Sequence, residues 1–398
     1  MQATLDQETS AAAGLRVTPR LGIIGGGQLA KMTAMAGLRL GCDIVVLERS
    51  PRSPAANLAT HALVGDWDDP KVLAQLAARV DVVTLENEFV AARSLAALAP
   101  LGCPVFPTAQ TMALVQDKLV QKQTLAAAGL PVPRCQAVAA PEDVGRAARE
   151  YGWPLLLKAR RNAYDGKGNA TVRAENDLPA AWEKLGGHRG NELFAEAFCP
   201  FTQELAIIIT RGRQGGVASY PVVETVQRDH ICHLVRAPAA LAPEIAERAA
   251  HLGRQAVAAV GAIGSFGVEM FLTAAGEILV NELAPRVHNS GHYTIEACAC
   301  SQFENHVRAV LGWPLGPTAL VVPAAVMVNL LGHSKGPGWP SGVDGALAVP
   351  GAHVHLYGKA VSAPGRKMGH VTAVGNSLAA AEEAALRSAR ELRFGTTS

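Results

Sequence analysis

The sequence is poor in aromatic and charged residues, and its charges of opposite sign nearly cancel. Aromatic residues make up 5% and charged residues 18% of the chain, with 36 Lys and Arg against 34 Asp and Glu. So few aromatic side chains argue against a base-stacking platform for single-stranded nucleic acid. The interspersed charges give no basic stripe for a nucleic acid and no patch for a membrane surface. We therefore expect neither kind of partner.

The sequence also lacks paired cysteines and long apolar runs. It has seven cysteines, an odd number, and no two of them have the C-x-x-C spacing of a zinc or redox site. Reduced thiols of a cytoplasmic protein are the expectation from this pattern. The first twenty residues contain no apolar segment of the kind found in a signal peptide. The apolar run Leu320–Leu331 is interrupted by Pro323 and Asn329, so no transmembrane span is predicted.

The N-terminal part alternates between short apolar runs and helical periodicity. The chain has 398 residues, of which 49% are hydrophobic, and this length predicts two or three subdomains. After a tail over residues 1–20, a strand at Leu21–Ile24 enters a glycine turn and then a helix at Gln28–Leu40. This rhythm is typical of an α/β, doubly wound parallel sheet of the Rossmann type. Further elements are expected at Ile44–Leu47, Pro70–Ala78, Val80–Leu85 and Val105–Pro107.

The pattern changes near Gln116, where a Lys- and Gln-rich helix at Asp117–Ala128 leads to a Gly- and Pro-containing boundary. Beyond this boundary, a glycine-containing loop at Tyr164–Asn169 follows a strand. A tight turn then joins two paired strands, the second of which ends at Glu282. The region after Val321 is richer in glycine and proline and ends in an alanine-rich helix. The expected elements are Pro154–Lys158, Leu193–Glu196, Glu204–Thr210, Val217–Val226, Glu244–Val260, Gly267–Leu272, Ile278–Glu282, His353–Tyr357, His370–Val374 and Leu378–Leu392.

The first candidate site is the glycine turn Gly25-x-Gly27-x-x-Ala30, which follows a strand and opens a helix. Glu48 ends the next strand, at the distance that the dinucleotide fingerprint requires. Backbone N–H groups at the helix start would suit a phosphate. Taken alone, the motif supports a nicotinamide enzyme, and the alternative is a tight turn without a ligand. Because no hydride-transfer constellation follows, the motif predicts the fold better than the cofactor.

The second candidate is a pair of glutamates, Glu269 and Glu282, each within a short apolar strand of the expected hairpin. Carboxylates on apolar strands are costly to bury unless a cation or a metal accompanies them. Mg²⁺ takes one or two carboxylates together with nucleotide phosphates, so the pair predicts a magnesium site. The alternative interpretation is two strand residues that face solvent.

The third candidate combines Lys118, Lys158 and the glycine-containing loop. A lysine on a strand followed by a flexible glycine loop is suited to hold phosphates and to close over them. Downstream, a hinge would present its backbone to adenine, and Glu204 would accept hydrogen bonds from ribose hydroxyls. The hinge consists of Glu196, Ala197, Phe198 and Cys199.

The fourth candidate is the polar segment that follows Glu282 and runs from Arg286 to His292. We expect polar residues at this density to lie outside the core, where their donors would suit a small or phosphorylated oxyanion. The alternative is a solvated loop. The donors are Arg286, His288, Asn289 and Ser290.

Six motifs in this order resemble those of the 5-(carboxyamino)imidazole ribonucleotide synthases, ATP-grasp enzymes of purine biosynthesis. The resemblance covers roughly residues 21–375, and the Arg-x-His-Asn-Ser-Gly-His segment is specific to this group among ATP-grasp proteins. The motifs are Gly25–Met32, Glu86–Val90, Asp117–Lys122, Tyr164–Gly168, Asn281–His292, and Gly358–Lys359 followed by Pro364–His370.

The resemblance implies an ATP-grasp fold with an N-terminal Rossmann-like domain and a small C-terminal β-rich domain, usually as a homodimer. The implied parts are a tail (1–20), an N-terminal domain (21–118), a lid subdomain (119–196), a catalytic subdomain (197–320) and a C-terminal domain (321–398). It also implies ATP and Mg²⁺, with Mn²⁺ as a substitute, and the substrates bicarbonate and aminoimidazole ribonucleotide.

Residue roles follow from the same resemblance. Lys118, Lys158, the hinge, Glu204, Gln227, Asn281 and Glu282 would bind ATP, and Glu269 and Glu282 would ligate Mg²⁺. Tyr164, Asp165, Arg286, His288 and Asn289, with Glu86 or Glu88, would act on bicarbonate and the imidazole nucleotide. Gly27, Gln28, Ser290, Lys359, Arg366 and Lys367 would bind substrate, the last three at its 5′-phosphate. The spacing of Glu86 and Glu88 places both on one strand face.

Two positions depart from the family pattern. Ala163 stands where glycine is frequent before Tyr-Asp, which would stiffen the lid loop. In the stretch Gln227–Ile231, glutamine replaces a histidine and His230 replaces a glycine, which puts the ATP contact of Gln227 in doubt.

The activity implied is transfer of the ATP γ-phosphoryl group to bicarbonate, followed by carboxylation of the nucleotide's exocyclic amine. Asp165 is the candidate for handling the amine proton. Other readings are an ATP-grasp ligase that uses formate or biotin, an NAD-dependent oxidoreductase, and a nucleotide-sensing module without catalysis.

Overall fold

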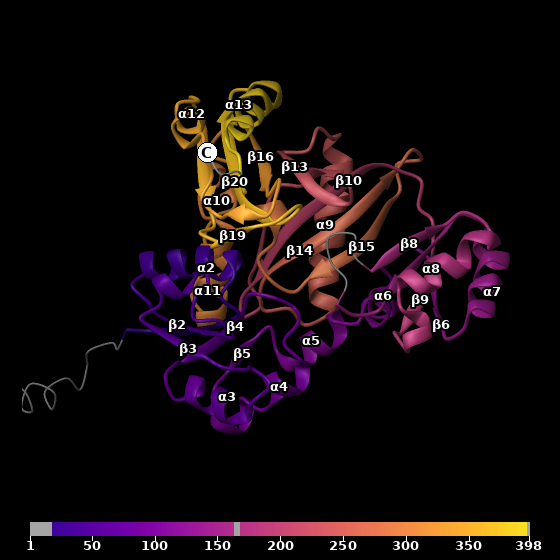
Figure 1. Ribbon diagram of the computed structural model, residues 1–398, viewed down its shortest axis with the longest axis horizontal. Coiled ribbons are helices and arrows are strands. Elements are labelled where there is room, and N and C mark those ends of the chain that lie inside the picture. The colour runs from indigo at the N-terminus through magenta and orange to yellow at the C-terminus, as the bar shows by residue number, and fades with distance from the viewer. Residues whose placement is uncertain (1–17, 163–167, 396–398) are drawn as a thin grey trace, which may run out of the picture.

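The computed structural model describes residues 18–162 and 168–395, and these residues form three large β-sheets and one two-stranded sheet. Figure 1 shows the N-terminal sheet, a lobe at the right formed by α7, α8 and their strands, and a large central sheet that continues into the C-terminal region. No helix within the described residues is long and apolar enough to cross a membrane. All seven cysteines are free thiols, as the sequence predicts.

The N-terminal sheet is parallel and has the strand order β3-β2-β1-β4-β5, which confirms the doubly wound arrangement. Its third strand in chain order was not expected, because His61–Val64 is an exposed edge strand without a buried apolar run. The strands are β1 (Arg20–Ile24), β2 (Asp43–Glu48), β3 (His61–Val64), β4 (Val82–Leu85) and β5 (Val105–Phe106). The helices are α2 (Gln28–Arg39), α3 (Pro70–Ala77), α4 (Ala92–Ala96) and α5 (Ala109–Val115).

The second sheet is antiparallel, has the order β6-β9-β7-β8, and carries two helices on its apolar side. Helix α6 (Lys118–Ala127) connects the N-terminal domain to it. The elements are β6 (Cys135–Val138), α7 (Pro141–Tyr151), β7 (Leu155–Ala159), β8 (Asn169–Val172), α8 (Leu178–Lys184) and β9 (Leu193–Ala197). We call these residues, 135–197, the lid sheet.

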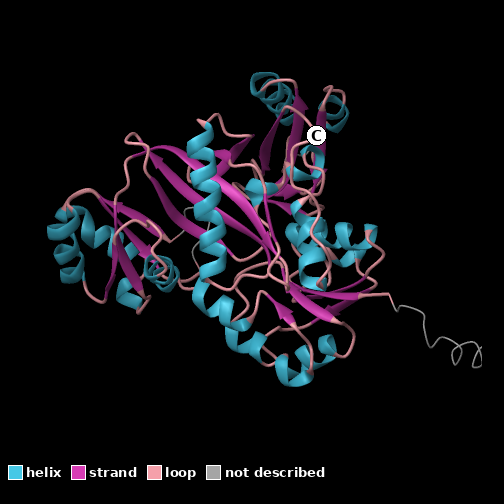
Figure 2. Ribbon diagram, turned by 180° about the vertical axis from the view of Figure 1, so that it is seen from behind, coloured by secondary structure: helices cyan, strands magenta, loops and turns pink. Residues whose placement is uncertain are grey.

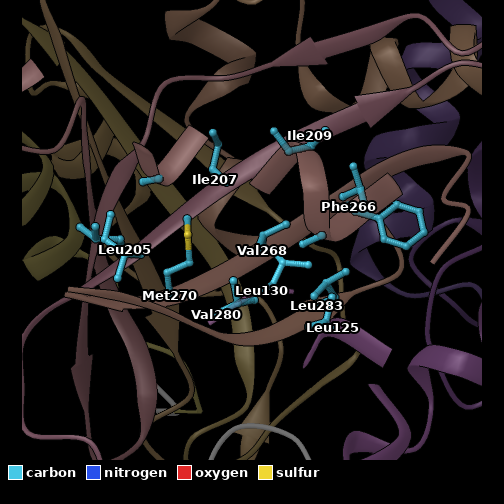
Figure 3. Packing of buried hydrophobic residues seen from close by; sticks show 14 of the residues in the cluster. Leu125, Leu130, Leu205, Ile207, Ile209, Phe266, Val268, Met270, Val280 and Leu283 are labelled. Atoms are coloured by element: carbon cyan, nitrogen blue, oxygen red, sulfur yellow. The ribbon is translucent and has the colours of Figure 1, made fainter. Parts of the chain in front are cut away.

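The third sheet has nine strands in the order β15-β14-β10-β12-β13-β16-β20-β18, with β11 paired to β10. Helix α9 (Pro243–Ala259) lies across one face (Figure 2) and packs on buried side chains such as Ile207 and Val268 (Figure 3). The strands are β10 (Phe201–Arg211), β11 (Val217–Ser219), β12 (Val223–Arg228), β13 (Ile231–Ala237), β14 (Gly264–Thr273), β15 (Ile278–Ala284), β16 (Ala324–Leu331), β18 (Ala352–Leu356) and β20 (Lys367–Gly375).

Two features of this sheet differ from the expectation. The single strand expected over Val217–Val226 is two strands, because Tyr220–Val222 leaves the ladder before the chain pairs again, as β12, with the same edge of β10. The sheet also includes β16, β18 and β20, which lie beyond the domain boundary expected between residues 320 and 321. The remaining elements are α10 (Thr294–Ala297), α11 (Gln302–Leu311), β17 (Gly336–Pro337), α12 (Val343–Leu347), β19 (Val361–Ser362) and α13 (Leu378–Glu391).

A buried hydrogen-bond chain joins the N-terminal sheet to the central sheet through His306 on α11. His306 Nδ1 accepts from the Ser265 backbone N–H at 3.0 Å, and Nε2 lies 2.7 Å from Thr84 Oγ1. Thr84 Oγ1 donates to the Phe106 carbonyl at 2.7 Å, so it accepts from His306 and the imidazole is neutral with its proton on Nε2. Protonation of Nδ1 would break the bond to Ser265.

This arrangement predicts a loss of stability in acid. Burial lowers the pKa of His306 to about 4, below its usual 6.5. Between those values the unfolded chain binds a proton that the folded protein does not, so stability is full above pH 6.5 and falls as pH decreases toward 4. This one group contributes up to about 1.4 kcal/mol per pH unit. Urea unfolding of the wild type and of His306→Gln at several pH values measures this pH dependence of the free energy of unfolding. The variant should be less stable at pH 7 but have a shallower acid slope, and equal slopes would contradict the prediction.

Candidate active site

Glu269 and Glu282 lie directly opposite each other on the antiparallel strands β14 and β15. Opposed residues on neighbouring strands share one face of the sheet, so the two carboxylates project to the same side. The hairpin expected from the sequence is therefore confirmed. The register shifts between Glu269 and Met270, which places the pair next to a β-bulge. Bulges of this kind redirect side chains near functional sites.

The electrostatics of this pair call for a cation. Burial, followed by the charges of Glu282 and Glu204, raises the pKa of Glu269 to about 7. Lys118 Nζ lies 2.7 Å from Glu282 Oε2, so a lysine supplies the positive charge beside the pair. The oxygen donors suit Mg²⁺, which also draws ligands from nucleotide phosphates. Within residues 18–162 and 168–395 no group of three His, Cys, Asp or Glu side chains forms a complete metal cage. A magnesium ion here would need phosphate oxygens as well.

Lys158 on β7 belongs to a buried cluster in the lid sheet. Its Nζ lies 2.5 Å from Glu196 Oε1, and Lys122 Nζ lies 2.7 Å from Glu196 Oε2. The Glu196 side chain is 1% exposed, and both of its oxygens are occupied by lysines. The Glu196 side chain is therefore engaged within the protein, and the contact of the hinge backbone with adenine stays a prediction. Phe198 in that hinge is 44% exposed.

Asp117 fixes the start of the helix that carries Lys118. Its carboxylate accepts from the backbone N–H groups of Leu119 and Val120 and so caps α6. The same carboxylate is 2.6 Å from Arg160 Nη2 at the end of β7. The Lys118 backbone N–H donates to the Arg160 carbonyl at 2.8 Å. The two lysines are thereby held on neighbouring elements.

Glu204 on β10 and Gln227 on β12 are also brought together. Burial raises the pKa of Glu204, and a hydrogen bond from Gln227 partly opposes this shift. The adjoining turn places Asp229 at φ 51° and His230 at φ 62°. This left-handed geometry explains why glycine suits the position of His230.

Arg286 and Glu88 form a partly buried bidentate ion pair between the central sheet and the N-terminal domain. The distances are 2.5 Å from Nε to Oε2 and 3.2 Å from Nη2 to Oε1. Although burial opposes it, Arg286 lowers the pKa of Glu88 to about 2. Glu86 instead has a raised pKa, mainly because of burial. Both glutamates lie beyond the end of β4 at Leu85, so the expectation that they share a strand face is wrong.

The segment from Arg286 to His292 is more buried than expected. Ser290 and His292 are each 1% exposed, which corrects the expectation that these residues lie outside the core. They are tolerated inside because they are hydrogen-bonded. Gln302 holds the His288 backbone from both sides, accepting from its N–H at 2.9 Å and donating to its carbonyl at 2.7 Å. Gln302 lies outside every motif predicted from the sequence.

The His288 side chain faces the carboxylate pair. Its Nε2 lies 3.4 Å from Glu269 Oε1, and Nδ1 lies 2.9 Å from Ser290 Oγ. Burial, reinforced by Arg286 and Lys367, lowers the pKa of His288 to about 3, so the imidazole is neutral. A Cβ at Gly267 would lie 2.5 Å from the His288 ring, which explains the glycine on β14.

The glycine turn is occupied by the protein's own carboxylates. Glu48 Oε2 accepts from the Gly26 N–H at 2.7 Å, so the acid of the dinucleotide pattern is bonded to the turn itself. A Cβ at Gly27 would lie 2.1 Å from Glu86 Oε1, which explains the absence of a side chain there. Gly27 and Gln28 open α2 next to Glu86.

The C-terminal cations lie around the turn before β20. Lys359 Nζ donates to the Lys367 carbonyl at 2.7 Å, and the exposed Arg366 Nη1 donates to the Val361 carbonyl at 2.6 Å. The charge of Lys367 acts on Glu269 and His288. Strand β19 pairs with β17 and not with β20. Tyr164 and Asp165, together with Ala163, lie outside the described residues.

Lys122 is a second residue of the candidate site that was not predicted from the sequence. It follows Lys118 by four residues, a spacing that puts both on one side of α6. That spacing was the available signal.

Three family profiles match successive parts of the chain. A ribonucleotide synthetase preATP-grasp domain matches residues 19–116, and an ATP-grasp domain matches residues 123–303. A phosphoribosylaminoimidazole carboxylase C-terminal domain matches residues 325–384.

Curated relatives agree with these profiles. The N5-carboxyaminoimidazole ribonucleotide synthase of Synechococcus elongatus is 41% identical over 353 residues, which cover 88% of each chain. The phosphoribosylaminoimidazole carboxylase of Ogataea methanolica is 42% identical over 366 residues, covering 90% of this chain and 67% of the relative. Further carboxylases are matched over 65% of their length, so the chain spans about two thirds of these longer relatives.

Solved structures of the same group superpose over most of the chain. The N5-carboxyaminoimidazole ribonucleotide synthetase of Thermotoga maritima has a TM-score of 0.85 at 40% identity and covers 96% of this chain and 100% of its own. The Aspergillus clavatus synthase, solved with ADP and 5-aminoimidazole ribonucleotide, has a TM-score of 0.85 at 36% identity, covering 92% and 96%.

The carboxylate pair yields a direct prediction. Glu282→Gln keeps the shape of the side chain and removes one charge, so binding of Mn²⁺ in the presence of ADP, measured by electron paramagnetic resonance, should weaken at least about tenfold. Turnover of ATP should slow at least about a hundredfold, as for loss of one electrostatic stabiliser. The free energy of unfolding should stay within about 1 kcal/mol of wild type, because Lys118 remains beside Glu269. Wild-type Mn²⁺ binding and turnover would place the metal elsewhere.

Proposed function

The chain belongs to the N5-carboxyaminoimidazole ribonucleotide synthase family of ATP-grasp enzymes, and we propose that it carboxylates 5-aminoimidazole ribonucleotide at the expense of ATP. The substrates would be ATP, bicarbonate and the ribonucleotide, and the products N5-carboxyaminoimidazole ribonucleotide, ADP and phosphate. The reaction belongs to purine biosynthesis. The observation that carries the proposal is the convergence of other parts of the chain on the opposed Glu269 and Glu282: Lys118 from α6 pairs with Glu282, and His288 from the segment after β15 lies beside Glu269.

ATP would lie between the lid sheet and the central sheet. Lys118 and Lys158 are assigned to its phosphates, the hinge at Glu196–Cys199 to adenine and Glu204 to ribose. Asn281 precedes Glu282, and its buried Oδ1 has no hydrogen-bond partner among the described residues. Bound Mg²⁺, or Mn²⁺ in its place, would supply charge neutralisation at the transferring phosphoryl group. The protein's part is to orient the phosphates with its lysines.

The acceptor side would be formed by the segment that begins at Arg286. Transfer of the γ-phosphoryl group to bicarbonate gives carboxyphosphate, an anion that Arg286, His288 and Asn289 would hold away from water. Asn289 Nδ2 is a buried donor without an oxygen or nitrogen acceptor among the described residues, and the Cys232 thiol beside it is a weak acceptor. The donor is therefore available for such an anion. Neutral His288 would donate through Nε2, since its Nδ1 is engaged by Ser290.

The amine of the ribonucleotide then attacks the carbon of carboxyphosphate, or CO₂ released from it. The new N–C bond forms as phosphate leaves, and the amine proton passes to a base, for which Asp165 is the candidate. Glu86 is the carboxylate at this end that is not paired with Arg286, so we assign Glu86 rather than Glu88 to the bicarbonate side. Lys359, Arg366 and Lys367 are assigned to the 5′-phosphate.

A coupled assay of ADP release tests the proposed function. ADP release should require ATP, Mg²⁺, bicarbonate and 5-aminoimidazole ribonucleotide together, and mass spectrometry should detect the carboxylated nucleotide. Stimulation by formate or biotin in place of these substrates would identify a different ATP-grasp ligase. Turnover independent of both nucleotide and bicarbonate would overturn the proposal.

The phosphate assignment predicts a selective effect of Arg366→Ala. A charge-assisted hydrogen bond contributes about 1.5–3 kcal/mol, so the KM for the ribonucleotide should rise roughly 10- to 150-fold. The KM for ATP should hardly change, because ATP is assigned to Lys118 and Lys158. Saturation curves for both substrates measure this, with Arg387→Ala, on the exposed face of α13, as the matched control. Equal weakening of both substrates, or of neither, would refute the phosphate clamp.

The proposal also includes a homodimer in the cytoplasm. The free thiols are in keeping with a reducing compartment. The exposed Trp339 and Leu347 of the C-terminal region are 70% and 59% accessible, and burial against a second subunit would account for them. The five-part division of the chain likewise remains a proposal, supported by the separate lid sheet.

A further inference from the structure

Lys122 is a buried lysine whose pKa is lowered by burial and supported by the charge of Glu196, and none of the roles assigned above uses it. Its side chain is 3% exposed. Nζ lies 2.7 Å from Glu196 Oε2 and donates to the Asn281 carbonyl at 2.9 Å. A buried ammonium group is costly unless it is paired, so its presence at this position calls for a reason.

The reason lies in the second partner of Glu196. Lys158 Nζ is 2.5 Å from Glu196 Oε1, and its side chain is 14% exposed, whereas that of Lys122 is 3% exposed. One glutamate therefore shares two lysines, and the cluster has one surplus positive charge. Of the two lysines, Lys158 is the one that lies at the accessible side of the cluster.

A phosphate can recruit Lys158 only if Lys158 leaves Glu196. If Glu196 had no other cation, this departure would strand a buried carboxylate, and the cost would be subtracted from phosphate binding. Lys122 keeps Glu196 compensated while Lys158 turns away. We propose that Lys122 is a positioning residue that frees Lys158 for the nucleotide phosphates and so sets the affinity for ATP.

The same lysine connects two parts of the nucleotide cleft. Glu196 belongs to β9 of the lid sheet, and Asn281 lies on β15 next to Glu282. Lys122 on α6 bonds to both, so the strand with the metal-binding candidate and the strand of the hinge share one cation. A purely structural role for this connection would appear as lost stability, which separates it from the proposed electrostatic role.

The test is equilibrium binding of the magnesium complex of AMPPNP, a non-hydrolysed ATP analogue. Lys122→Met keeps a long apolar stem but removes the charge, which leaves Lys158 locked to Glu196. The Kd for AMPPNP should rise roughly 10- to 150-fold, the range for loss of a charge-assisted phosphate contact. Lys122→Arg, which keeps the charge, should fall between this variant and wild type. Lys184→Met, at an exposed lysine of the lid sheet, is the matched control and should bind as wild type does.

The decisive variant is the double substitution Lys122→Met with Glu196→Gln. It removes one charge of each sign, restores the surplus positive charge on Lys158, and should return the Kd to within about fivefold of wild type. An unchanged Kd in Lys122→Met would overturn the proposal. So would a double variant that binds no better than the single one, because a merely structural lysine is not rescued by removing its partner. Thermal unfolding of each variant in the absence of nucleotide verifies that the comparison is between folded proteins.

This inference rests on one part of the proposed function, which is that ATP binds between the lid sheet and the central sheet. The binding experiment uses neither bicarbonate nor ribonucleotide. Tight AMPPNP binding in a wild-type protein that fails to carboxylate the ribonucleotide would refute the proposed reaction and leave the role of Lys122 standing. In the active enzyme, Lys122→Met should raise the KM for ATP while the KM for the ribonucleotide stays within about twofold of wild type.

Discussion

Buried and partly buried carboxylates, each paired with a cation from another part of the chain, determine how this structure is assembled. Glu282 on the central sheet takes Lys118 from α6, Glu88 at the edge of the N-terminal sheet takes Arg286, and Glu196 in the lid sheet takes Lys122. The Glu196 pair is the most costly to break, because its carboxylate is 1% exposed and would be stranded in the interior, whereas the other two pairs are partly buried. The three sheets are thereby held against one cleft by the same charges that the chemistry requires.

The apolar framework makes these charges possible. The strands β10, β14 and β15 present buried apolar side chains such as Ile207, Val268 and Met270 on one face (Figure 3), and α9 packs on this face. Glu269 alternates with Val268 and Met270 and therefore projects from the opposite face, together with Glu282. Burial raises the pKa of Glu269, and repulsion by the Glu282 carboxylate on the same face raises it further. A site built in this way favours a divalent cation with a negatively charged ligand over either one alone.

Hydrogen bonds set the orientation of the neutral groups around this pair. Gln302 grips both backbone groups of His288, and His306 connects the same helix to Thr84 beneath the glutamates of the N-terminal domain. Because α11 carries both Gln302 and His306, a shift of this helix would move His288 and the N-terminal sheet together. The cleft thus depends on one helix that has no candidate ligand of its own. Burial keeps both histidines neutral, which preserves their single donor and single acceptor at neutral pH.

The sequence by itself determined the local structure and the identity of the main charged groups. The glycine turn, the helix at Gln28 and the hairpin with its two glutamates were predictable because each depends on neighbouring residues and on a repeating apolar pattern. The order of the motifs was sufficient to indicate the family. Only the tertiary structure decided which charges meet: that Arg286 neutralises Glu88 and leaves Glu86, that Glu196 faces two lysines, and that Ser290 and His292 are inside. These outcomes depend on residues far apart in the chain, and a polar side chain looks the same in sequence whether water or a distant partner satisfies it.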